Sequence, residues 1–200
     1  MTTHKGSGWI GYWSPGIGDP SVVGWVTVAL YALAAILCFR CASWVKARAD
    51  VVGRKLEVLL WRITAVTLCF LCINKQLDLQ TAMTEFGRIV AYQQGWYAVR
   101  FKVQKAFIAV FALSGFLVLT WLLAATWHLS RSLKLAMVGL CFIGVFVLIR
   151  ASSFHHVDVF LGKRFFDAKW NWILEIGGIS VVTVAACARL LSQKTRIRAE

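Results

Sequence analysis

Five apolar runs of membrane-spanning length constrain this chain more than any other feature of its sequence. A helix that crosses a bilayer needs about 20 mostly apolar residues. The runs cover residues 21–40, 56–77, 103–127, 133–150 and 170–191. Both prolines, Pro15 and Pro20, precede the first run, so the later runs can be helical without interruption. The sequence predicts an all-α, polytopic membrane bundle of about five transmembrane helices, in a single domain, 1–200.

The composition agrees with a bilayer environment. Hydrophobic residues make up 59% of the chain, and its mean hydropathy is +0.68. A soluble domain of this kind would expose large apolar patches and aggregate. The net charge of +13 raises the question of nucleic-acid binding. The basic residues lie between the apolar runs, however, where they are typical of topology determinants and headgroup contacts. We therefore expect a lipid bilayer as the partner, and no nucleic acid.

The connections between the runs predict an orientation. Residues 78–102 and 151–169 form long polar connections, which share one side of the membrane by alternation. Residues 41–55 and 128–134 form short basic connections on the other side. Because basic residues in short loops favour the cytoplasm, we expect the N-terminus outside and the C-terminus inside. The expected location is the plasma (inner) membrane.

Several residues near the predicted membrane ends are expected to serve packing or anchoring. Asp19 is expected to be the N-cap of the first helix. Trp44 and Trp61 are expected in the aromatic belt of the inner interface. Glu57 and Arg62 also lie near that interface, and we expect their side chains to reach toward it.

Two Cys-x-x-Cys pairs could suggest a zinc site. The pair Cys38/Cys41 ends the first run, whereas Cys69/Cys72 lies near the far end of the second. At 1.5 Å per residue, the pairs are roughly 15–20 Å apart along the membrane normal. They cannot share one ion, and we expect all of these cysteines to pack in apolar surroundings.

The second run continues into a segment with polar residues at helical spacing. These residues are Asn74, Asp78, Thr81, Glu85 and Arg88. They predict one polar face on a second helix that is extended, or bent at the outer interface. An amphipathic interfacial helix with this face in water explains the same pattern.

The segment after the fourth run carries potential metal ligands. Its residues His155, His156 and Asp158 suit a divalent metal such as zinc, although adjacent histidines point to different faces of a helix. Haem is not expected, because His128 lies at the opposite end of the bundle from His155 and His156.

The fifth run contains an acid at a depth where a charge is costly. Glu175 follows Asn171 by one helical turn and lies inside the apolar span. Such a residue faces the bundle interior and pairs with a base. Arg150 is the first candidate for that base, and Arg100 and Lys75 are the others.

These segments bring polar groups to one depth on the outer side, which predicts a polar site there. The first hypothesis is a metal-dependent hydrolase that acts on a lipid or amphiphile. It assigns catalysis to Asp78, Glu85 and Glu175, metal binding to His155, His156 and Asp158, and ligand binding to Asn74, Lys75, Arg100, Arg150 and Asn171. The alternative is a non-catalytic subunit or sensor, whose polar cluster is a structural ion-pair network or a partner-contact face. A third hypothesis is a proton relay through Glu175 and Asp78.

Three short motifs carry a resemblance. They are NKQLDLQ at residues 74–80, GWY at 95–97 and SSFHHVD at 152–158. Together they resemble a group of small bacterial multi-pass membrane proteins without an established activity, which implies a fold and a location but no reaction. A looser similarity is to alkaline-ceramidase-like membrane hydrolases, which use Ser, Asp and three His around zinc. This chain has fewer predicted spans and lacks a His-x-x-x-His motif.

Overall fold

The computed structural model of the protein describes residues 8–48, 51–151, 164–165 and 168–197. Its helices are α1 (Val22–Ala47), α2 (Arg54–Leu77), α3 (Leu79–Gln93), α4 (Arg100–Ala125), α5 (Arg131–Ala151) and α7 (Trp170–Ile197), with a 3-10 turn, η1 (Tyr97–Val99), before α4. Strands β1 (Arg164–Phe165) and β2 (Ala168–Lys169) pair antiparallel just before α7. Apart from this short ladder and an isolated bridge between Ile10 and Trp13 in the non-helical segment before α1, the regular structure of the described part is helical, as predicted.

Three helices in the described part are long and apolar enough to cross a bilayer. They are α1, α2 and the segment Leu174–Ser192 of α7. The chain is therefore an integral membrane protein, as its composition predicted. Helices α4 and α5 occupy the other two predicted ranges, and α4 contains the shorter apolar stretch Ala112–Leu122.

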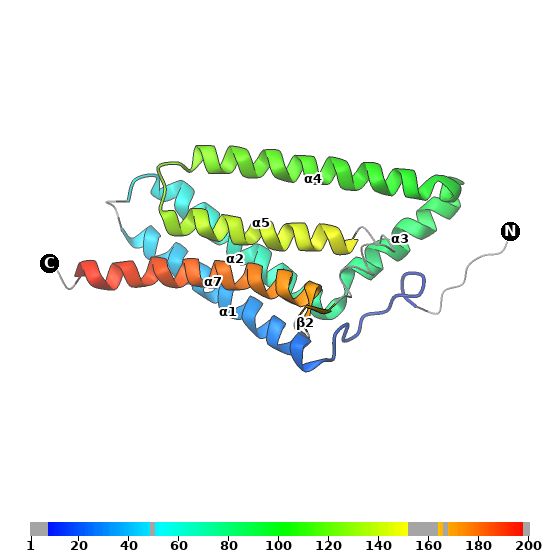
Figure 1. Ribbon diagram of the computed structural model, residues 1–200, viewed down its shortest axis with the longest axis horizontal. Coiled ribbons are helices and arrows are strands. Elements are labelled where there is room, and N and C mark those ends of the chain that lie inside the picture. Colours follow the sequence, from blue (N-terminus) through cyan, green and yellow to red (C-terminus); the bar gives the residue numbers. More distant parts are fainter. Residues whose placement is uncertain (1–7, 49–50, 152–163, 166–167, 198–200) are drawn as a thin grey trace.

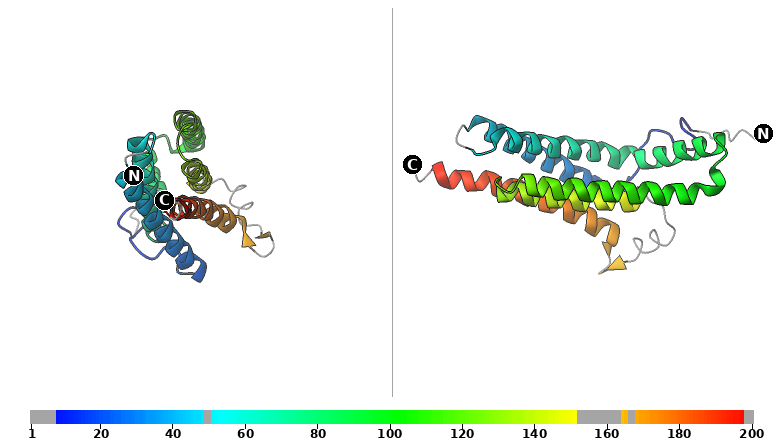
Figure 2. Two further views of the ribbon diagram at one scale, coloured as in Figure 1. Left: turned by 90° about the vertical axis from the view of Figure 1, so that its left-hand side faces the viewer. Right: turned by 90° about the horizontal axis from the view of Figure 1, so that it is seen from above.

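The helices run roughly lengthwise in one bundle (Figure 1). Helix α1 packs against α2 and α7, and α7 also packs against α5. Helix α4 lies outermost and approaches the others chiefly through α5 (Figures 1 and 2). We call the end with connections 48–53 and 126–130 the short-loop end. The opposite end, where α2 meets α3 and where α7 begins, is the long-loop end.

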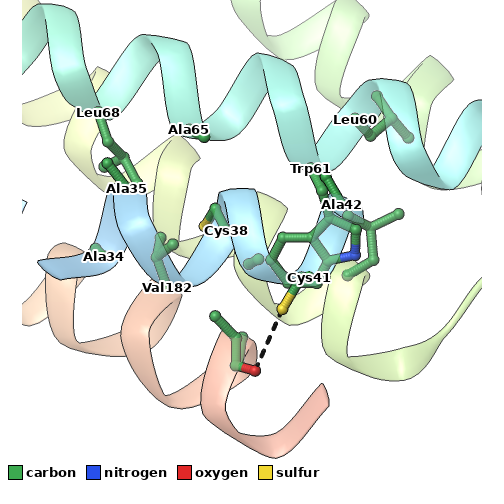
Figure 3. Packing of buried hydrophobic residues seen from close by; sticks show 14 of the residues in the cluster. Ala34, Ala35, Cys38, Cys41, Ala42, Leu60, Trp61, Ala65, Leu68 and Val182 are labelled. Atoms are coloured by element: carbon green, nitrogen blue, oxygen red, sulfur yellow. Dashed lines mark hydrogen bonds between the residues drawn. The ribbon is translucent and has the colours of Figure 1, made fainter. Parts of the chain in front are cut away.

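Small side chains on α1 allow close helix packing. The buried ones are Ala34, Ala35, Cys38, Cys41 and Ala42. Larger side chains fill the space against them, namely Trp61 and Leu68 of α2 and Val182 of α7 (Figure 3). The Cys41 thiol donates to the Ala186 carbonyl of α7 at 3.4 Å. The predicted core role of Cys38 and Cys41 is therefore confirmed.

Helices α5 and α7 meet through glycines. A Cβ added to Gly139 would lie 3.0 Å from the Gly178 carbonyl oxygen, and one added to Gly178 would lie 3.2 Å from the Gly139 carbonyl oxygen. Such small residues let membrane helices approach backbone to backbone. This close contact fixes where α7, and with it Glu175, sits in the bundle.

The start of α1 differs from the prediction. Its N-cap is Ser21, not Asp19, because the Ser21 hydroxyl oxygen accepts from the Gly24 amide at 3.0 Å. Asp19 instead accepts hydrogen bonds from the Ser21 hydroxyl at 2.6 Å and from the Ser21 amide at 3.2 Å. The Asp19 carboxylate is thereby held outside the helix, where it can reach another residue.

Candidate functional site

The α2–α3 junction at the long-loop end breaks at a single residue. Asp78 adopts a left-handed conformation with φ 48° and ψ 49°, which aspartate tolerates better than most residues. The residues before α1 cap the broken end. The Gly18 amide donates to the Gln76 carbonyl at 2.6 Å, and the Trp13 indole donates to the Leu77 carbonyl at 3.1 Å. These bonds satisfy carbonyls that the end of α2 leaves without helical partners.

The break changes the predicted polar face. The predicted bend of the second helix is confirmed. The prediction of one continuous polar face from Asn74 to Arg88 is wrong. The left-handed backbone of Asp78 ends α2, and α3 then begins with a different axis and rotation. Asn74 and Asp78 consequently point to one site, and Glu85 belongs to another.

A buried ion pair connects α2 to α7 at this end. The Lys75 ammonium donates to Glu175 Oε2 at 2.9 Å, and the two side chains are only 7% and 4% exposed. The Tyr31 hydroxyl of α1 donates to Glu175 Oε1 at 3.3 Å. Lys75 Nζ also lies 3.5 Å from Asp19 Oδ2. The base that pairs with Glu175 is therefore Lys75. The sequence-based prediction favours Arg150 for this role, with Lys75 as an alternative.

Asp19 lies at the water-facing side of this pair. Partial burial raises the pKa of Asp19, but the hydrogen bonds from Ser21 and the Lys75 ammonium outweigh it. The net result is a pKa below the ordinary value of 3.8. Asp19 is therefore ionised at neutral pH and adds a second negative charge beside Lys75.

A small cavity adjoins the ion pair. Its volume is about 20 Å³, and it is lined by Tyr31, Leu71, Asn74, Lys75, Asp78, Gln80, Phe146, Val147 and Glu175. That volume suits a single water molecule with polar partners. The predicted residues Asn74, Lys75, Asp78 and Glu175 thus come together, as the shared depth of their segments suggested.

Glu85 lies apart from this cavity. Its carboxylate pairs with Arg88 one turn along α3 at 2.9 Å. It also packs against the segment before α1, since a Cβ on Gly11 would lie 2.6 Å from Glu85 Oε2. Gly11 has φ +59°, so glycine suits both its backbone and this close approach. Glu85 therefore holds the N-terminal segment and is not among the residues around the cavity.

The other predicted site residues are only partly described. Arg100, Arg150 and Asn171 lie in α4, α5 and α7, and their side chains are outside the described part. His155, His156 and Asp158 lie outside the described residues altogether. Within the described residues, no three His, Cys, Asp or Glu side chains gather closely enough to hold a metal ion.

A second buried carboxylate occupies the short-loop end. Glu57 Oε1 accepts from Arg189 Nε at 3.0 Å, from the Ser130 hydroxyl at 2.7 Å and from the Trp61 indole at 3.4 Å. Both Glu57 and Trp61 are almost completely buried. These contacts join α2, α7 and the α4–α5 connection.

This cluster corrects two predictions. Glu57 does not reach toward the interface with Arg62, because it is buried among its partners while Arg62 is exposed. Trp61 is a core residue and not part of an interfacial belt. One signal in the sequence could have revealed the cluster. The runs 56–77 and 170–191 each carry an acid near their start and a base near their end, which is the pattern for two antiparallel helices that pair at both ends.

Comparisons of the chain with protein-family models, with curated proteins and with solved structures find no match. The resemblance to the group of small bacterial membrane proteins accordingly stays a prediction. Function has to be inferred from the residues of this chain and their geometry.

Proposed function

We propose that the chain is a membrane protein of five spanning helices that acts as a non-catalytic subunit of a membrane complex. The pairing of Lys75 with Glu175 beside a cavity of about 20 Å³ carries this proposal. A catalytic carboxylate must reach its substrate, whereas Glu175 is bound to Lys75 and Tyr31 and adjoins space for one water molecule. A polar cluster of this kind fixes the packing of helices.

Helix α4 supports the assignment as a subunit. Its side chains Val110, Phe116 and Trp121 are 65%, 64% and 68% exposed, although the helix is apolar. It approaches its own bundle chiefly through α5. A spanning helix with so little contact to its own chain offers most of its surface to another membrane protein.

The size of the particle in native membranes tests this proposal. The chain would be extracted together with its surrounding lipid, and we expect a complex heavier than the 22.4 kDa monomer, with a second protein in fixed ratio. Phe116→Ala on α4 is expected to release that protein. The matched variant Phe70→Ala removes a similarly exposed ring, 56%, from α2 and is expected to leave the complex intact. Extraction as a monomer alone would exclude the subunit role.

A metal-dependent hydrolase is the second candidate, and the position of the α5 end favours it. Val147 lines the cavity, and α5 ends soon afterwards at Ala151. His155 follows the last residue of α5 by four positions in the sequence. With His156 and Asp158 it would hold a divalent metal such as zinc, which activates water. The substrate would be a lipid or other amphiphile of the outer leaflet.

Metal analysis separates the two candidates. The hydrolase requires a stoichiometric transition metal in the purified protein, lost in His155→Ala and His156→Ala. A preparation without such a metal would eliminate the hydrolase and leave the subunit proposal standing.

The charge distribution supports the short-loop end as the cytoplasmic one, in a plasma membrane. Acids at the long-loop end pair with Lys75 and Arg88. In the described part of the short-loop end, Glu57 is the acid, and it is buried against Arg189. The positive-inside rule counts Lys and Arg in and beside short connections, and at the short-loop end these are Lys46, Arg48, Arg54, Lys55, Arg131 and Lys134.

Labelling with a membrane-impermeant maleimide tests this orientation. Ser14 and Ser43 are exposed at the long-loop and short-loop ends, respectively. We expect reagent outside the cell to label Ser14→Cys but not Ser43→Cys. The unsubstituted protein is the control for labelling of the native cysteines. Labelling of Ser43→Cys in intact cells would reverse the orientation.

A further inference from the structure

Trp44 at the short-loop end lies close to two guanidinium groups. Arg48 Cζ lies 5.1 Å and Arg189 Cζ 5.3 Å from the centroid of the Trp44 ring. One guanidinium comes from just after α1, and the other comes from the last part of α7. An indole face attracts a cation at this distance, so both groups lie beside the same indole ring.

The positive charge at this point exceeds its local compensation. Glu57 binds Arg189 through Nε at 3.0 Å and is itself buried. Arg48 has no carboxylate partner within the described part of the chain. Arg54 lies nearby, since its Nη1 donates to the main-chain carbonyl of Arg48 at 3.3 Å. Among the described residues, Glu57 is the carboxylate that contacts this basic group, and it contacts Arg189, so the group can take an additional anion.

The geometry selects the chemistry of that anion. A guanidinium presents a planar fork of N–H donors that matches two oxygens of a phosphate group. Arg189 uses Nε for Glu57 and keeps its terminal Nη groups for a further acceptor. An indole at the end of a spanning helix lies at the level of lipid headgroups. A phosphodiester in the membrane surface meets all three conditions.

We propose that Trp44, Arg48, Arg54 and Arg189 form a binding site for the headgroup of an anionic phospholipid. The lipid would lie in the leaflet at the short-loop end, with its phosphate between the guanidiniums and its acyl chains along α1 and α7. The site lies at the opposite end of the bundle from the Lys75–Glu175 pair. It requires only that α1 and α7 span the bilayer, and it holds whether or not the chain is a subunit or a hydrolase.

Native mass spectrometry of the detergent-solubilised protein tests the site. The protein would be incubated with equal amounts of phosphatidylglycerol and phosphatidylcholine, and the adducts of each would be counted. We expect phosphatidylglycerol to dominate. Arg48→Gln should lower its preference over phosphatidylcholine by about fivefold, the effect of one basic residue at an anionic surface. Arg48→Lys keeps the charge but loses the planar fork, so it should fall between the wild type and Arg48→Gln.

Arg131→Gln is the matched control. Arg131 is an exposed base in the first turn of α5 at the same end, without a ring contact in the described part. Its removal lowers the total charge equally and should leave the lipid preference unchanged. Equal effects of Arg48→Gln and Arg131→Gln, or equal adducts of both lipids with the wild type, would overturn the site. Displacement of the lipid by inorganic phosphate would show that the site binds free phosphate and not a headgroup.

Discussion

The ion pair between Lys75 and Glu175 allows a quantitative test of how the bundle is held together. Lys75→Met removes the ammonium and keeps a side chain of similar length. It leaves the Glu175 carboxylate, 4% exposed, with the Tyr31 hydroxyl as its remaining partner among the contacts described above. Removal of one member of a buried pair costs about 3–5 kcal/mol, because the other charge stays buried without compensation.

We therefore expect Lys75→Met to lower the free energy of unfolding by about 4 kcal/mol at neutral pH. Nearby Asp19 is 31% exposed and can be hydrated, so it adds little to this loss.

The double variant Lys75→Met/Glu175→Gln isolates the coupling. The amide introduced by Glu175→Gln keeps an oxygen that accepts from Tyr31, while the stranded charge is removed. We expect the stability of the double variant to lie within about 1–2 kcal/mol of the wild type, because replacement of a whole buried pair is often close to neutral. The free energies would be measured by titration of the protein in mild detergent with a denaturing detergent.

Two outcomes would refute this reasoning. Lys102→Met, an exposed lysine on α4, is the matched control and should change stability by less than about 0.5 kcal/mol. A loss in Lys75→Met no larger than in this control would mean that the pair does not stabilise the fold. A double variant as unstable as the sum of its single variants would mean that the two residues are not coupled.

Other contacts lead to further predictions. Gly178→Val should destabilise the α5–α7 contact by about 1–3 kcal/mol through overpacking. Gly144→Ala on α5 should not, because a Cβ there would meet open space. Equal melting temperatures of the two variants would contradict the close approach of α5 and α7. Ser130→Ala removes a hydrogen bond to the Glu57 carboxylate and should cost about 2 kcal/mol, and no loss in detergent titration would count against this contact. The lowered pKa of Asp19 means that its ionised form stabilises the fold above its ordinary value of 3.8, and that this contribution disappears as the pH falls through the lower folded value. Melting temperatures of wild type and Asp19→Asn should accordingly differ at neutral pH and converge in acid, and a constant difference would show that the carboxylate charge is not responsible.

The depth of the polar residues was predictable, and their pairing was not. Asn74, Asp78 and Glu175 were expected at one level, and they do line one cavity. Depth follows from counting residues along an apolar run, which the sequence allows. The partner of Glu175 depends on how each helix is rotated about its axis, and that rotation is fixed by contacts such as Gly139 with Gly178 between different helices.

The misassignment of Glu57 has a similar geometric cause. Glu57 and Arg62 are five positions apart, which places them roughly 140° apart around a helix. Trp61, four positions on, lies within about 40° of Glu57 and shares its buried side. Helical spacing alone therefore favoured Trp61 as the neighbour of Glu57. Arg189 could be recognised only once α2 and α7 were known to run in opposite directions.

The two buried pairs are reciprocal, and this restricts the topology. Helix α2 carries its acid, Glu57, near its start and its base, Lys75, near its end, and α7 carries Glu175 and Arg189 in the same order. Both pairs form together only when α2 and α7 are antiparallel and in one lengthwise register, because any other arrangement strands charges inside the bilayer. The apolar surfaces of these helices fit lipid in many registers, so the charges supply the specificity that apolar packing lacks.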